Sequence, residues 1–306
     1  MKTREIFRKM FPIKNSKMDD KDFVPFGGNE IQTPDIDHAR VVVLPVCYEN
    51  KPSYGTGSAT GPYHILNASL HLERMDEEAL LDWGLRKIHT TAPLCPSNDP
   101  AQAIRQIQQA AESVFKQNKF LLSLGGDHAV SIGPIKAASD RYPDIGVLQI
   151  DAHFDLRDEW QGSRYNHACV MRRVVEDAQV KVVPVGVRAI DPEEADFLSQ
   201  RNISPFYAHE IDPWDYTWID RIVDALPTKV YLTIDLDGLD PSVIPGTGTP
   251  EPGGLSYRQL VELIKMVGLK KKVVAADITE LAKIEGTQVS EFTAAKIATK
   301  IIVYCL

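Results

Sequence analysis

Cysteine is scarce in this sequence, with four residues in a chain of 306. Cys47, Cys95, Cys169 and Cys305 are widely separated, and no two of them form a Cys-x-x-Cys pair. Zinc knuckles and small disulfide-stapled domains both depend on closely spaced cysteines, so the sequence predicts neither. Scattered thiols are instead typical of reduced cysteines, and we expect a cytoplasmic protein.

Positive charge and long apolar runs are lacking as well. The formal net charge is -8 at pH 7, and the sequence pI is about 5.5. Such a chain repels nucleic acids and anionic membrane surfaces on average, so we expect neither as a partner. No apolar run approaches the ~20 residues of a membrane-spanning helix. The expected partner is a small molecule, and a cationic one suits the acidic surface.

No linker rich in proline, glycine or serine divides the chain, which predicts one large domain. The first 18 residues are basic and carry apolar side chains at helical spacing. A targeting or membrane-surface helix would need a longer apolar segment, and Glu5 also disfavours it. We therefore predict that these 18 residues form a solvated or subunit-contact segment. They belong to an N-terminal arm at 1–38, which is followed by the domain at 39–306.

Short apolar runs rich in β-branched residues alternate with amphipathic stretches along the domain. The apolar positions in the runs are continuous, as in strands that helices cover on both faces. This pattern predicts an α/β domain of three layers with a mostly parallel sheet. Strands are expected at 39–46, 119–124, 145–150, 180–187, 229–237 and 272–278, and helices at 101–117, 192–201, 256–268 and 290–304. Ser256 and Ser290 are the expected N-caps, and Gln259 completes a capping box with Ser256.

Side chains capable of chemistry follow four of the expected strands. The sequence GGDH (125–128) follows one strand, DAHFD (151–155) the next and DLDGLD (235–240) a third, while Glu280 lies just beyond the last. Ligands of parallel α/β sheets bind at the carboxyl ends of the strands. We therefore expect these four segments to meet at one crevice.

The spacing within these segments indicates a metal site. In an extended segment, alternate residues share a face, so the acidic and imidazole groups of DAHFD can point to one place. The candidate ligands are His128, Asp151, His153, Asp155, Asp235 and Asp237. Six ligands are too many for one zinc ion, and they suit two divalent ions with bridging aspartates. Carboxylate and imidazole donors without thiolate favour manganese, and ligand softness leaves nickel, iron and cobalt open.

Longer motifs around these residues resemble the ureohydrolases, the arginase and agmatinase family. The resemblance is carried by LGGDHAVSIG (124–133), LQIDAHFDLRD (148–158) and LTIDLDGLDPSVIPGTGTPEPGG (232–254), the third being similar to the agmatinase branch. SYGTGSATGP (53–62) and TELAKIEGTQVSEFTAAKI (279–297) are also agmatinase-like. The resemblance implies an arginase-like α/β/α fold with eight parallel strands and a homotrimer or homohexamer. It makes 39–306 a catalytic domain with two Mn²⁺ per chain.

The resemblance also implies roles for individual residues. His128 and Asp155 would bind one manganese and His153 and Asp237 the other, with Asp151 and Asp235 bridging. The metals would lower the pKa of a water that attacks the guanidinium carbon, and Asp155 would orient that water. Glu280 would bind the substrate guanidinium. His167 would contact the substrate and transfer protons to the leaving amine.

The region around Arg157 bears on the substrate. Family members that act on arginine carry an asparagine where this chain has Arg157, and Ser/Asn groups where it reads RDEWQGSRYN. Agmatine, which would give putrescine and urea, is therefore the expected substrate, and Asp158 or Glu159 would attract its ammonium group. Arg157 and Arg164 leave guanidinobutyrate open as a rival, because either could bind a carboxylate; formiminoglutamate and free guanidine are further alternatives.

Two alternatives lie outside ureohydrolase chemistry. A deacetylase with the arginase-like fold would use one zinc ion, which the set of six ligands disfavours. A non-catalytic family member would be expected to have lost ligands, and none is missing. Departures from the family pattern at HAC (167–169) and LAKIEG (281–286) flank the expected substrate, so they concern substrate choice more than chemistry.

Overall fold

The computed structural model describes residues 23–31 and 33–306. The basic segment 1–18 of the expected arm lies outside these residues. Within the rest of that arm, Phe26 and Ile31 are buried in the core, and the Phe26 ring packs edge-on against Trp83. No helix in the described part of the chain combines the length and apolarity needed to cross a membrane.

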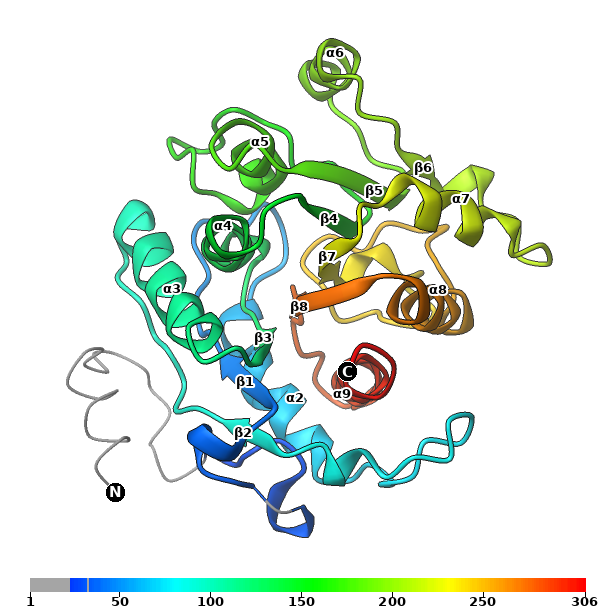
Figure 1. The fold of residues 1–306 in the computed structure, drawn as a ribbon. Coiled ribbons are helices and arrows are strands. Elements are labelled where there is room, and N and C mark those ends of the chain that lie inside the picture. The colour runs from blue at the N-terminus through cyan, green and yellow to red at the C-terminus, as the bar shows by residue number, and fades with distance from the viewer. Residues whose placement is uncertain (1–22, 32) are drawn as a thin grey trace.

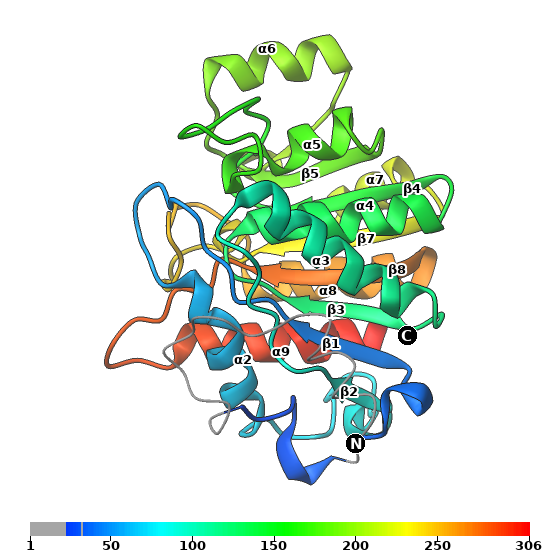
Figure 2. The ribbon, with the colours of Figure 1, turned by 90° about the vertical axis from the view of Figure 1, so that its left-hand side faces the viewer.

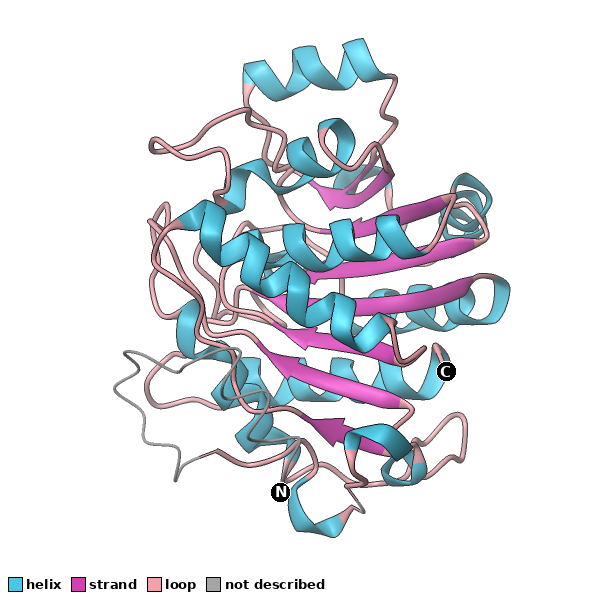
Figure 3. Ribbon diagram, turned by 60° about the vertical axis from the view of Figure 1, so that its left-hand side comes forward, coloured by secondary structure: helices cyan, strands magenta, loops and turns pink. Residues whose placement is uncertain are grey.

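One sheet of eight parallel strands forms the centre of the described structure, and all its strand arrows run toward the same group of loops (Figure 3). The strand order is β2-β1-β3-β8-β7-β4-β5-β6. The strands are β1 (Val41–Pro45), β2 (Ile88–Thr90), β3 (Phe120–Leu124), β4 (Ile145–Ile150), β5 (Lys181–Val187), β6 (Phe206–Tyr207), β7 (Lys229–Asp235) and β8 (Lys272–Thr279).

Helices cover both faces of the sheet (Figures 1 and 2). One face packs on α3 (Pro100–Phe115), α4 (Ile132–Arg141) and α5 (Val170–Glu176), and α6 (Pro192–Arg201) lies beyond α5. The other packs on α2 (Gly61–Ser69), α7 (Thr217–Ala225), α8 (Tyr257–Lys270) and α9 (Val289–Tyr304). Successive strand residues are buried on opposite sides, which explains their continuous apolar runs. The prediction of a three-layer α/β/α fold is confirmed.

The capping predictions had mixed outcomes. Ser256 caps α8, and Gln259 completes the predicted capping box. Ser290 does not cap α9, because that helix already begins at Val289. Its buried hydroxyl instead accepts a hydrogen bond from the backbone N–H of Gly246 at 2.9 Å. Ser290 therefore ties α9 to a loop that follows β7.

The strand order brings the functional segments together. The strands β3, β8, β7 and β4 are consecutive neighbours in the middle of the sheet. GGDH follows β3, Glu280 follows β8, Asp235 ends β7 and DAHFD follows β4. Because the strands are parallel, all four segments emerge at the same edge, as expected.

Candidate metal centre and active site

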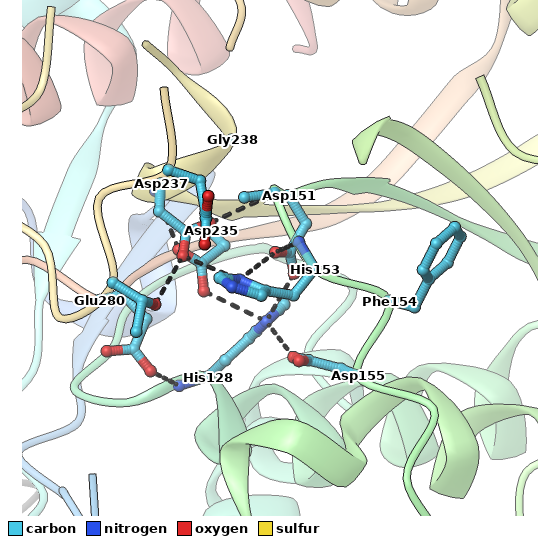
Figure 4. Close-up of polar contacts among 12 residues, drawn as sticks. His128, Asp151, His153, Phe154, Asp155, Asp235, Asp237, Gly238 and Glu280 are labelled. Atoms are coloured by element: carbon cyan, nitrogen blue, oxygen red, sulfur yellow. Dashed lines mark hydrogen bonds and ion pairs between the residues drawn. The ribbon is translucent and has the colours of Figure 1, made fainter. Parts of the chain in front are cut away.

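The first half of the candidate metal centre surrounds His128. Its Nδ1 atom lies 2.9 Å from Asp155 Oδ2, 3.1 Å from Asp151 Oδ2 and 3.4 Å from Asp235 Oδ2 (Figure 4). All four side chains are buried. None of the carboxylates is aligned to form a hydrogen bond with Nδ1. Three oxygens converging on an unpartnered nitrogen form a donor set that suits a cation.

The second half surrounds His153 and shares Asp151 with the first. His153 Nδ1 lies 3.1 Å from Asp237 Oδ2 and 3.7 Å from Asp151 Oδ1. Asp151 therefore turns one carboxylate oxygen toward each histidine, as a bridging ligand would. The two groups that could hold an ion are His128 with Asp151 and Asp155, and Asp151 with His153 and Asp237. The structure brings all six predicted ligands to one place.

The backbone of DAHFD reaches this arrangement differently from the expected extended segment. The chain bends at Ala152 and His153, and Asp155 adopts a left-handed conformation with φ of 55°. The side chains on either side of Phe154 still point into the cluster while the phenyl ring points away (Figure 4). The predicted convergence is confirmed, but simple alternation does not explain it. A left-handed aspartate is sparsely populated and is typical of functional sites.

The segment after β7 also differs from its prediction. The expected strand 229–237 ends at Asp235, and a short 3₁₀ helix at Leu236–Gly238 carries the second aspartate. Asp235 caps this helix by accepting the N–H of Asp237 through Oδ1 at 3.0 Å. Its Oδ2 remains free to face His128. One carboxylate thus stabilises the turn and contributes to the cluster.

Close backbone approach requires glycine beside the first histidine. A β-carbon on Gly126 would lie 1.8 Å from the carbonyl oxygen of Tyr48. Real β-carbons do not come this close, so a larger residue would displace the GGDH loop. Asp127 fixes the same contact, because its N–H bonds to Tyr48 and its Oδ2 accepts the N–H of Asn50 at 2.7 Å.

Burial and mutual charge perturb the pKa values across the cluster. Burial raises the pKa of Asp235 well above its ordinary value, and the neighbouring Asp237 and Asp151 add to the rise. Burial and Asp151 likewise raise the pKa of Asp155 to about 7. Burial opposes the charged form of His128, but the negative charges of the nearby Asp151 and Asp155 outweigh it and raise the pKa of His128. Four buried carboxylates crowd two imidazoles, an arrangement that bound cations would stabilise.

Glu280 lies next to the His128 side of the cluster. Its Oε1 accepts the backbone N–H of His128 at 2.8 Å, and its own φ is 65°. Burial and the nearby Asp127 raise the pKa of Glu280 well above its ordinary value. A guanidinium bound here would favour the ionised carboxylate. The position therefore suits a cationic ligand.

His167 is partly buried, and its ring contacts Ser53 from another loop. Its Nε2 atom is 2.9 Å from the Ser53 hydroxyl, which accepts the indole N–H of Trp160 at 3.2 Å. Burial, with positive charge on His128 and His153, lowers the pKa of His167 to about 4. The ring is therefore uncharged at neutral pH and can accept or pass on a proton. Ser53 begins the SYGTGSATGP segment and Trp160 lies in RDEWQGSRYN, but the sequence did not predict that the two would meet at His167. Local sequence does not encode contact between two loops.

Arg157 and Asp158 have partners within the protein. The Arg157 guanidinium lies 2.8 Å from Asp191 and stacks 4.3 Å from the centre of the Trp160 ring. Asp158 accepts from buried Arg173 at 2.6 Å and from Arg164 at 3.1 Å. The structure does not bring either charge to the six-ligand cluster. Arg157 instead supports the indole that contacts Ser53.

Further polar residues support the cluster from outside. The Gln149 amide on β4 donates to Asp151 Oδ2 at 2.9 Å and to the His153 carbonyl at 3.1 Å. The Thr249 hydroxyl donates to Asp237 Oδ2 at 3.2 Å. Sequence reasoning missed both. The signal available for Gln149 was a polar side chain within a buried apolar strand.

Metal removal should destabilise the protein. We expect chelation of Mn²⁺-loaded protein to lower the thermal unfolding midpoint by at least about 5 °C. At a free Mn²⁺ concentration about 100 times the dissociation constants, two sites add about 5 kcal/mol to the free energy of unfolding. In a chain of this size, 1 kcal/mol corresponds to roughly 2 °C in the unfolding midpoint. Differential scanning calorimetry with and without excess Mn²⁺ measures the shift. Re-addition of Mn²⁺ in excess over the chelator is the control and should restore the midpoint; an unchanged midpoint after chelation would contradict the metal site.

Comparison with known proteins places this geometry in a family. The sequence model of the Arginase family matches residues 39–304. An N(1)-aminopropylagmatine ureohydrolase from Synechocystis sp. is 41% identical over 277 residues, which cover 87% of this chain and 89% of the relative. An agmatinase from Pyrococcus horikoshii is 34% identical over 275 residues, covering 89% and 94%.

Solved structures agree with the sequence comparison. The crystal structure of agmatine ureohydrolase of Thermoplasma volcanium matches with a TM-score of 0.82 and 27% sequence identity, covering 98% of this chain and 97% of the other. The eight-stranded parallel sheet thus has the arginase-like fold. This chain belongs to the arginase family, and within it to the agmatinase branch of the ureohydrolases.

Proposed function

We propose that this chain is a binuclear metal enzyme that hydrolyses a guanidine with an amine tail to urea and an amine. The observation that carries the proposal is the Asp151 carboxylate shared between the His128 and His153 groups, with Glu280 alongside. Carboxylate and imidazole donors favour manganese, and nickel remains an alternative. A homotrimer or homohexamer and a cytoplasmic location remain part of the proposal.

Each residue has a task in the proposed reaction. When bound, two divalent ions supply Lewis acidity and a water of lowered pKa. Asp155 orients the attacking water toward the guanidinium carbon. Glu280 holds the guanidinium through paired charge-assisted hydrogen bonds and presents that carbon to the water. His167, uncharged at neutral pH, would take up a proton released by the attacking water and pass it to the amine nitrogen as the C–N bond breaks.

Two observations support a substrate with an amine tail: the names of the relatives, and the side chains beside His167. Relatives at 41% and 38% identity are named for N(1)-aminopropylagmatine, and one at 34% is named for agmatine. We therefore propose N(1)-aminopropylagmatine as the preferred substrate and agmatine as the second. A tail leaving past His167 meets Ser53 and the Trp160 indole, whose ring can attract an alkylammonium group. Arg157 and Asp158 act on the tail through this loop.

Urea release from five guanidines tests the proposal. The Mn²⁺-loaded and Ni²⁺-loaded protein is assayed with N(1)-aminopropylagmatine, agmatine, guanidinobutyrate, arginine and guanidine. We expect the highest kcat/KM with the first of these. Preference for guanidinobutyrate would overturn the amine-tail assignment and make Arg157 or Arg164 a carboxylate anchor. Absence of urea from all five with either metal would overturn the proposed function.

Replacement of His167 tests the proton transfer. We expect His167→Ala to lower kcat about a hundredfold, because general acid-base catalysis typically contributes 10²- to 10⁴-fold. Two metal ions per chain should remain bound, and added imidazole should partly restore the rate. His209→Ala is the matched control, since His209 stacks on Tyr207 away from the cluster. Metal loss in His167→Ala would identify a ligand instead.

A further inference from the structure

A line of buried polar groups extends from the Nε2 side of His128. His128 Nε2 is 2.9 Å from Thr233 Oγ1, whose hydroxyl donates to Asp277 Oδ1 at 2.6 Å. The Tyr231 hydroxyl donates to the other carboxylate oxygen of Asp277 at 2.7 Å. None of the four side chains is more than 1% exposed. Polar groups buried this deeply destabilise a fold unless each finds a partner.

Strand register brings these groups together. Tyr231 and Thr233 are two residues apart on β7, so they share a face of the sheet. Thr233 is directly opposite Asp277 on β8. The neighbouring strand β3 leads into the loop that carries His128. The arrangement therefore belongs to the rigid centre of the sheet.

The hydrogen-bond roles in this line are fixed by the number of protons. An ionised Asp277 can only accept hydrogen bonds, so Thr233 donates its one hydroxyl proton to that carboxylate. Thr233 can then only accept from His128, which places the imidazole proton on Nε2. In the neutral ring, the form that binds a metal ion, the lone pair is then on Nδ1, the atom that faces Asp151, Asp155 and Asp235. This is the tautomer in which His128 can bind a metal ion through Nδ1.

We propose that Thr233 and Asp277 are positioning residues that hold the His128 ring in its Nε2–H tautomer and so set metal affinity on the His128 side of the site. This inference rests on the proposed metal-dependent function. His153 has no part in the line, so an ion on its side should be affected little. The Tyr231 hydroxyl supports the same role by fixing Asp277.

Metal titration of Thr233 variants tests the inference. Metal-free protein is titrated with Mn²⁺, and electron paramagnetic resonance counts the free ion. We expect Thr233→Val to raise the dissociation constant of one of the two Mn²⁺ ions ten- to hundredfold. This is the usual effect of losing a hydrogen bond to a metal-binding histidine. The dissociation constant of the other ion should stay within about threefold of the wild-type value. Thr233→Ser, which keeps the hydroxyl, should resemble wild type.

A control and a second readout separate positioning from general damage. Thr279→Val removes a buried β8 hydroxyl that bonds only weakly to the Ile234 carbonyl at 3.4 Å, and should leave both constants unchanged. In Thr233→Val, half-maximal activity should shift to higher free Mn²⁺ by the same factor, with kcat restored at saturation. Asp277→Asn should weaken the same ion, and the double variant should lose less than the sum of the two effects.

The outcomes distinguish this inference from the proposed function. If Thr233→Val does not fold, Thr233→Ala removes the same hydroxyl with a smaller side chain. The positioning role alone would be overturned if a folded variant without the Thr233 hydroxyl kept both wild-type Mn²⁺ dissociation constants. It would also be overturned if the variant bound both ions more weakly by the same factor. A wild-type protein that binds fewer than two ions would overturn the proposed function itself.

Discussion

Asp235→Ala is expected to lower kcat/KM for urea release at least about a thousandfold. The Asp235 carboxylate lies 3.4 Å from His128 Nδ1, and we propose that it bridges the two metal ions. Loss of a bridge removes the Lewis acidity that a metal pair supplies, which is worth several kcal/mol, and a thousandfold corresponds to about 4 kcal/mol. Metal analysis of the purified variant should find fewer than two ions per chain.

A second substitution separates this effect from local unfolding. Asp235 also caps the short helix at Leu236–Gly238, so alanine removes a hydrogen bond worth about 1 kcal/mol. Asp235→Asn keeps an oxygen for that cap and loses only the charge; it should also lose activity and metal. Asp240→Asn is the control, because Asp240 bonds to Ser242 and Gly253 in the same loop. Full activity of Asp235→Asn with two bound ions would contradict the bridging role.

Glu280→Gln is expected to lower kcat/KM at least about a hundredfold, with two metal ions still bound. A desolvated carboxylate facing a guanidinium contributes a few kcal/mol, and a hundredfold corresponds to about 2.7 kcal/mol. Glutamine keeps an oxygen for the His128 N–H, so the neighbouring backbone should not move. Urea release from N(1)-aminopropylagmatine and agmatine measures the effect.

The metal count separates the two roles that Glu280 could have. Glu280 is not among the six candidate ligands, so an activity loss at full metal content would support substrate binding. Metal loss in the variant would instead make Glu280 part of the metal site. Glu112→Gln is the control, because that glutamate lies on α3 and contacts Gln108 and Lys116 there. A variant with near-wild-type kcat/KM would contradict guanidinium pairing.

The central strands could be predicted from sequence because their apolar runs are long and flanked by polar turns. The two edge strands could not, since β2 (Ile88–Thr90) and β6 (Phe206–Tyr207) are too short to form a recognisable run. Helix α4 was missed because Gly133 and Pro134 near its start resemble a turn. Neighbouring elements fix these segments, and local sequence does not encode that information.

The candidate site divides in the same way. Its six ligands follow strand ends, so parallel topology alone predicts their convergence. The contact of Thr233 and Asp277 with His128 could not be predicted. These two residues lie inside strands, and only the folded sheet defines the register between the strands. Their one local signal is polarity within a buried run, most clearly the carboxylate in VVAADI (273–278). Contacts between loops, such as Ser53 with His167, leave no such signal.

The position of β8 determines when the site can form during synthesis. This strand is made after all the others, yet it lies between β3 and β7. Ribosomes add about 5–20 residues per second, so for some seconds after β7 is complete the sheet exists only as two separate halves with open inner edges. His128 belongs to one half, and the other five candidate ligands belong to the other. The His128 group can therefore be completed only after β8 is inserted, whereas Asp151, His153 and Asp237 already belong to one half. Until then the two exposed edges are where a nascent chain is most prone to aggregate.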